Sequence, residues 1–150
     1  MGVRVLEGRA EREIDAPLER CLEVLRDVEC WPDWISTVSS VAVLERDDSG
    51  RPAQVVVEAR LVGLPLWFAA DVSVGEPGEL TIRRVPHDES DPERLELAVR
   101  LEETAAAACR ATATLSAGLE VPRLVPLPGA VADQVAGRLL ADLAGRMLGP

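Results

Sequence analysis

The chain has 150 residues, a length at which a single domain over residues 1–150 buries a substantial core. Hydrophobic residues make up 47% of it and charged residues 28%, a balance typical of soluble globular proteins. The formal net charge is −10, and all 16 basic residues are Arg. Such a surface repels phosphate backbones, so the composition argues against binding to nucleic acid.

The N-terminal stretch MGVRVLEGRAEREID lacks the apolar segment of a signal peptide. No run of about 18 apolar residues is present, so no transmembrane segment is expected. Cys21, Cys30 and Cys109 show no CxxC spacing, and their odd number without a secretion signal favours reduced thiols and a cytoplasmic location. The single His87 lies in the polar run PHDESDPE, so we expect neither a metal site nor a cofactor.

Residues 3–14 alternate like a strand, and a helix is expected to follow from Pro17, which suits the first helical position. Its apolar face has helical spacing and consists of Leu18, Cys21, Leu22, Leu25 and Val28. Pro32 ends this helix and begins a second short one that carries Trp34 and Ile35.

Beyond Val38 the hydrophobic pattern changes to a period of two. Turn-forming residues divide it into strands over 38–46, 53–62, 66–74, 79–85, about 95–102 and 107–117. Short turns between consecutive strands indicate an antiparallel meander. A long helix over residues 130–148 then carries an apolar stripe of Val131, Val135, Leu139, Leu143 and Met147.

An antiparallel sheet has one face to cover, and the C-terminal helix is suited to cover it. The inward positions of the last strand are Cys109, Ala111 and Ala113, which are small for a core. Either the helix packs very close to them, or the space beside them is left for another molecule.

Three motifs resemble the START-like helix-grip superfamily, in particular its bacterial polyketide cyclase/dehydrase and coenzyme-Q-binding-type members. They are a helix start of the type apolar-x-APxE, a WPxW corner and a strand reading VLERDxxGR. Here these motifs comprise Ile14, Ala16, Pro17 and Glu19, then Trp31, Pro32 and Trp34, then Val43, Leu44, Glu45 and Arg46. The resemblance covers essentially the whole chain. It implies an α+β helix-grip fold, in which a curved antiparallel sheet of about six to seven strands wraps round the long C-terminal helix, with two short helices after the first strand.

The resemblance also implies an elongated apolar cavity between sheet and C-terminal helix, with the tryptophan corner, residues 31–34, near its mouth. Trp31 and Trp34 either form a wall of this cavity or plug the corner between the short helices and the sheet. The residues expected to contact a ligand are Trp31, Trp34, Ile35, Val57, Ala59, Trp67, Asp71, Leu97, Val99, Cys109, Ala111, Ala113, Val135, Leu139 and Leu143.

The aromatase/cyclase branch of the family uses a pocket Arg, and a pocket Tyr in some members. Alignment places Asp71 and Val38 at these positions, and the chain contains no Tyr and no Asn. The acid and base groups that cyclisation needs are therefore not recognisable, and no catalytic residue is predicted.

Two orientations are possible for the strand over 66–74. Hydrophobicity favours the orientation in which Leu66, Phe68 and Ala70 face inward and Asp71 faces solvent. The cyclase resemblance favours the opposite one, in which Trp67 and Asp71 line the cavity. The apolar row would then face outward as a candidate homodimer surface.

The leading hypothesis for function is the binding or carrying of a hydrophobic small molecule, such as a lipid, an isoprenoid quinone or a polyketide-like compound. One alternative is a polyketide aromatase/cyclase or dehydratase. Another is a non-catalytic interaction domain with a collapsed cavity. The fold alone does not separate them, because it supports carriers, cyclases and sensors.

Overall fold

We describe the protein from a computed structural model, which describes residues 2–61, 63–75, 78–121 and 130–148. The elements, in chain order, are β1 (Gly2–Ile14), α1 (Leu18–Arg26), the 3-10 turn η1 (Val28–Cys30), α2 (Trp31–Trp34), β2 (Val38–Arg46), β3 (Pro52–Leu61), β4 (Leu64–Gly75), β5 (Glu79–Arg84), β6 (Arg94–Ala105), β7 (Ala108–Val121) and α3 (Val131–Leu148).

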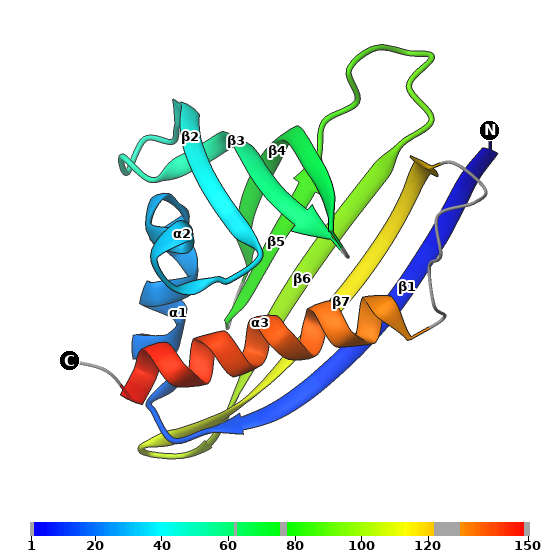
Figure 1. The fold of residues 1–150 in the computed structure, drawn as a ribbon. Helices are drawn as coiled ribbons and strands as arrows, with labels where there is room; N and C mark the ends of the chain where they lie inside the picture. The colour runs from blue at the N-terminus through cyan, green and yellow to red at the C-terminus, as the bar shows by residue number, and fades with distance from the viewer. Residues whose placement is uncertain (1, 62, 76–77, 122–129, 149–150) are drawn as a thin grey trace.

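The seven strands form one antiparallel sheet with the order β1-β7-β6-β5-β4-β3-β2. Strands β2 to β7 pair as a meander, and β1 joins the far edge by pairing with β7 along its whole length. The sheet curves round α3, and α1 and α2 lie at one end of it (Figure 1). The expected α+β helix-grip fold, with short helices after the first strand, is confirmed.

The prediction that Pro32 ends the first helix is wrong, because α1 already ends at Arg26 and Val28 belongs to η1. Pro17 has extended backbone angles and lies just before α1, one residue earlier than expected, and its carbonyl accepts hydrogen bonds from the first turn. Pro32 lies in the first turn of α2, where a missing N–H costs nothing. The apolar face of α1 is buried through Cys21, Leu22 and Leu25.

Helix α3 crosses the concave face and packs against β1 and β7 (Figure 1). They approach each other closely at Gly8, where a Cβ atom would lie 2.3 Å from the backbone carbon of Ala132. The side chain of Asp133 accepts a hydrogen bond from the Arg9 N–H at 2.7 Å, which fixes the start of α3 on β1. The helix therefore lies unusually close to this edge of the sheet.

Close packing also explains the small residues of β7. Cys109, Ala111 and Ala113 are fully buried in the same hydrophobic core as Ala136 and Leu140 of α3. Of the two explanations that the sequence allowed, the structure shows close packing at these positions.

The orientation of β4 is the one that hydrophobicity favours. Leu66, Phe68 and Ala70 face the interior, whereas the side chain of Trp67 is 70% exposed and Asp71 lies on the outer face. The Asp71 carboxylate accepts a hydrogen bond from the Gln54 side chain at 3.2 Å. The outward apolar row considered as a dimer surface does not arise on this strand.

Candidate ligand cavity

A cavity of ≈ 90 Å³ lies between the concave face of the sheet and α3. Among the described residues, every strand except β1 contributes to its wall, and only Thr37 and Arg60 bring polar side-chain atoms apart from one indole N–H. The lining residues are Trp31, Ile35, Thr37, Val38, Val57, Ala59, Arg60, Leu66, Phe68, Ile82, Leu95, Leu97, Leu115, Val135 and Leu139.

The structure brings together about half of the residues expected to contact a ligand. Those that line the cavity are Trp31, Ile35, Val57, Ala59, Leu97, Val135 and Leu139. Five others are buried in the core outside the cavity wall, namely Val99, Cys109, Ala111, Ala113 and Leu143. Trp34 packs against the core beside the cavity, while Trp67 and Asp71 lie on the outer face of β4.

Eight lining residues were not predicted as ligand contacts, and most of them have a signal in the sequence. Leu66, Phe68 and Ile82 occupy inward positions of alternating strands, as do Leu95 and Leu115. Val38 had a signal only in the family resemblance, which aligns it with a pocket Tyr. Thr37 and Arg60 lack a signal, because they lie in the corner between α2 and β2 and near the end of β3.

Trp31 is both a core residue and a wall of the cavity. Its side chain is 3% exposed, and its indole N–H donates to the Leu25 carbonyl at 2.9 Å. Leu25 lies in the last turn of α1, where backbone carbonyls lack a partner within the helix. The hydrogen bond therefore caps α1 and orients the indole toward the cavity.

Trp34 meets a different environment three residues later. It is partly buried against the hydrophobic core, and its indole N–H is buried without a hydrogen-bond partner among the described residues. It does not line the cavity. Of the two indoles in the tryptophan corner, only Trp31 could touch a ligand in the cavity as it stands.

The exposed rim of the cavity is formed by the start of β2 and the end of β3. The Arg60 N–H donates to the Thr37 carbonyl at 2.8 Å, which extends the pairing of the two strands to the rim. The Arg60 side chain is exposed there. A ligand that passes this rim would meet one guanidinium and one hydroxyl before it reaches wholly apolar side chains.

A polar tie joins α3 to Ser36, which lies between α2 and β2. The backbone N–H and the hydroxyl of Ser36 both donate to one carboxylate oxygen of Asp142, at 2.9 and 2.8 Å. Arg138 donates to the Ser36 hydroxyl at 3.0 Å and pairs with Asp142 at 3.3 Å. Because Ile35 and Leu139 line the cavity on either side, this tie closes one of its flanks.

The sheet has a gap where β5 ends. The last hydrogen bond to β4 on this side comes from Val85, just after β5, whose N–H donates to the Ala69 carbonyl at 2.8 Å. No strand in the described part of the chain lies beside residues 64–68 on that side. A second hollow of ≈ 290 Å³ occupies this gap, and it is lined by Leu64, Pro65, Leu66, Trp67, Phe68, Arg84, Glu93, Leu95, Leu119, Glu120 and Val121.

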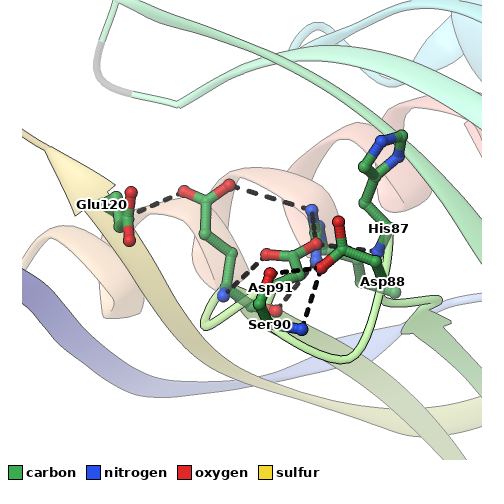
Figure 2. A network of polar contacts seen from close by, with 7 residues as sticks. His87, Asp88, Ser90, Asp91 and Glu120 are labelled. Carbon is green, nitrogen blue, oxygen red and sulfur yellow. Dashed lines mark hydrogen bonds and ion pairs between the residues drawn. The ribbon is translucent and has the colours of Figure 1, made fainter.

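A network of polar contacts holds the loop between β5 and β6 beside this gap (Figure 2). Arg84 pairs with Asp91 at 2.8 Å and donates to the Glu93 carbonyl at 2.8 Å. The Glu93 carboxylate accepts a hydrogen bond from the Glu120 N–H at 2.8 Å. The backbone N–H of His87 and the Arg84 guanidinium lower the pKa of Asp91 to about 2, so the ion pair persists at neutral pH.

Cys21 and Cys109 are free, fully buried thiols whose sulfur atoms lie 3.6 Å apart. Burial and the neighbouring thiol raise the pKa of Cys21 to about 12, and burial also raises the pKa of Cys109. Both thiols therefore stay protonated at neutral pH and serve as core side chains.

Neither a metal site nor a membrane-spanning helix is found in the described part of the chain. No group of three or more His, Cys, Asp or Glu side chains there is arranged to hold a metal ion. None of the helices there combines the length and apolarity that crossing a bilayer requires.

The family described as "Polyketide cyclase / dehydrase and lipid transport" matches residues 14–148. The chain belongs to this family. No curated protein is significantly similar to it in sequence. Family membership agrees with a fold that encloses a hydrophobic ligand, and it leaves the ligand and any reaction open.

Solved structures share the fold at low sequence identity. A START superfamily protein from Mycobacterium smegmatis is 20% identical, with 95% of this chain and 99% of that chain covered and a TM-score of 0.75. A protein from Thermus thermophilus is 23% identical, with 95% and 97% covered and a TM-score of 0.78. The Zhui aromatase/cyclase from a Streptomyces species is 15% identical, with 97% and 90% covered and a TM-score of 0.65.

Proposed function

We propose that the protein binds or carries a hydrophobic small molecule, such as a lipid, an isoprenoid quinone or a polyketide-like compound, in the cavity under α3. The observation that supports this proposal is the lining: 13 of its 15 described residues are apolar, and the two others, Thr37 and Arg60, stand at the rim. Burial of apolar ligand surface contributes about 25 cal/mol per Å², so such a wall is itself a source of affinity.

The lining supports binding more than catalysis. Cyclisation or dehydration needs groups that give and take protons at the reacting atoms. The described cavity wall contains no carboxylate, imidazole, phenol or thiol. The aromatase/cyclase alternative would therefore need catalytic groups from outside this wall, and no observation favours it over binding.

The size of the cavity bears on how binding takes place. Its volume of ≈ 90 Å³ is smaller than the roughly 150 Å³ apolar cavity that accommodates benzene in an engineered protein. A lipid or quinone would therefore have to widen the cavity or extend beyond it. Binding of an apolar probe would separate the proposal from a collapsed interaction domain, which would bind none.

Native mass spectrometry of protein purified from its own host should show a co-purifying apolar molecule. In vitro, the neutral probe N-phenyl-1-naphthylamine should bind saturably and gain fluorescence. Ala59→Leu adds three carbons to the cavity wall and should weaken probe binding about tenfold. Ala42→Leu makes the same change at an exposed position of β2 and serves as the control.

The proposal fails if the wild type binds no apolar probe, or if Ala59→Leu binds it as well as Ala42→Leu does. The cytoplasmic location and the homodimer remain predictions from the sequence.

A further inference from the structure

We propose that the gap between β4 and β6 is a polar subsite for the head group of an amphipathic ligand. The head would be one that donates hydrogen bonds and carries no negative charge, such as a hydroxyl or an ammonium group. The apolar body of the same ligand would occupy the cavity under α3. This inference rests on the proposed function and extends it to the ligand's polar end.

The gap and the cavity share part of their walls. Of the described residues, Leu66, Phe68 and Leu95 line both spaces, so these side chains stand between them. All three are partly buried, and none of them is locked in the fully buried core. A modest rotation of their side chains would join the apolar cavity to the more polar hollow.

The volumes favour an occupant that extends through both spaces. Drug-sized ligands occupy pockets of roughly 300–1,000 Å³. The cavity at ≈ 90 Å³ falls far below this range, and the gap at ≈ 290 Å³ approaches its lower end. The two spaces together reach the lower part of this range.

The edge of β4 offers hydrogen-bonding groups to the gap. Backbone groups alternate between the two sides of an antiparallel strand. Because the Ala69 carbonyl faces β5, the backbone groups of Pro65 and Trp67 face the gap. Pro65 has no N–H, so this edge presents two carbonyl acceptors and one donor, a set that suits a donating head group.

The charges at the gap disfavour an anion. Arg84 is already paired with the carboxylates of Asp91 and Glu93, at 2.8 and 3.8 Å, so its charge is compensated. Among the described residues of the wall, the remaining charge is the Glu120 carboxylate. The exposed indole of Trp67 lies on the same wall and would attract a cation to its face.

Three probes with the same C12 chain test the subsite: dodecanol, dodecylamine and dodecanoate, each below its micellar concentration at pH 7. Their affinities are measured by displacement of N-phenyl-1-naphthylamine. Dodecanol and dodecylamine should bind about tenfold more tightly than dodecanoate, the scale of one charge-assisted hydrogen bond.

The charge contribution is tested with Glu120→Gln, which removes one carboxylate from the gap and keeps its shape. In this variant the ratio of the affinities for dodecylamine and dodecanoate should fall about threefold or more, while the affinity for dodecanol stays unchanged. Glu102→Gln, an exposed position at the far end of β6, is the matched control and should leave all three affinities as they are.

Two results would overturn the subsite, and they are distinguishable. If the three probes bind equally well, or dodecanoate binds best, the gap does not discriminate between head groups, although the cavity binds the alkyl chain. If neither N-phenyl-1-naphthylamine nor any C12 probe binds, the proposed function fails and the subsite fails with it.

Discussion

Trp31 and Trp34 come from one short helix and differ in whether their indole N–H finds a partner. Trp31 donates to the Leu25 carbonyl, whereas the N–H of Trp34 is buried without a described partner. A buried donor without a partner costs about 1–3 kcal/mol, and removing one member of a satisfied pair costs a similar amount. Replacing each residue with Phe therefore has opposite consequences for hydrogen bonding.

We expect Trp31→Phe to lower the free energy of unfolding by about 1–3 kcal/mol, because it leaves the Leu25 carbonyl unpaired. Trp34→Phe removes an unpaired donor, so the lost packing is offset and the change should be clearly smaller. Urea denaturation of both variants measures the difference. Equal losses would mean that the hydrogen bond of Trp31 contributes nothing beyond packing.

The buried thiols predict a loss of stability at alkaline pH. The pKa of Cys21 is raised from 9.0 in the unfolded reference to about 12 in the fold, so the fold favours the protonated thiol. This contribution is complete below pH 9 and is lost as the pH rises from 9 toward 12. The loss for one such group is at most about 1.4 kcal/mol per pH unit.

Unfolding free energies of wild type and Cys21→Ala, measured from pH 7 to 10.5, check this prediction. The curves should run parallel up to pH 9, and above it the wild type should fall more steeply. Parallel curves over the whole range would show that Cys21 titrates equally in both states.

At the scale of elements, the contact between β1 and α3 depends on one glycine. A Cβ at Gly8 would collide with the α3 backbone at Ala132 and Asp133, whereas a Cβ at Gly137, on the same interface, would lie 3.8 Å from the nearest atom. The backbone cannot yield as a side-chain end can, so α3 would have to move away from the sheet.

Gly8→Ala should therefore lower the free energy of unfolding by about 2 kcal/mol or more, and the melting temperature should fall with it. Gly137→Ala should leave stability unchanged or raise it by up to about 1 kcal/mol, because Ala favours the helix. Thermal denaturation of the two variants compares them directly. A harmless Gly8→Ala would show that α3 does not approach β1 this closely.

The sequence predicted the elements well because their periodicities are strong. The strand of Leu95, Leu97 and Val99 and the stripe of α3 follow from spacing alone. The hydrophobic pattern predicts that β7 ends at residue 117. In the structure β7 continues to Val121, because β1 pairs with β7 over its full length. Such long-range pairing lies outside what local periodicity reports.

The candidate site was less predictable than the fold. Inward position was inferred correctly for Val99 and Ala111, yet α3 covers this end of the sheet closely and leaves space only farther along. Whether a residue such as Arg60 lies at the rim of the cavity depends on where the strands end in space. The gap beside Arg84 arises because β5 is shorter than its neighbours, a difference that hydrophobicity patterns do not reveal.

At the scale of the whole molecule, the net charge of −10 predicts a dependence on salt. Like charges repel one another more in the compact state, and salt screens this repulsion. Most ion pairs here, such as that between Arg46 and Glu29, are exposed and contribute little. The melting temperature should therefore rise between 20 and about 300 mM NaCl.

Sucrose at equal osmolality provides the control, because it changes hydration without screening charge. A melting temperature that falls with NaCl would mean that the ion pairs outweigh the repulsion among carboxylates.

The tie between Ser36 and Asp142 has a consequence for hydrogen exchange. The Ser36 amide donates to a side chain of α3, so its proton is shielded only while α3 stays docked against the tryptophan corner. The neighbouring Ile35 amide donates to Trp31 within the local turn and is shielded independently of α3. The ratio of the two exchange rates therefore reports how often α3 separates from the tryptophan corner. A bound ligand that spans the cavity would slow the exchange of the Ser36 amide alone.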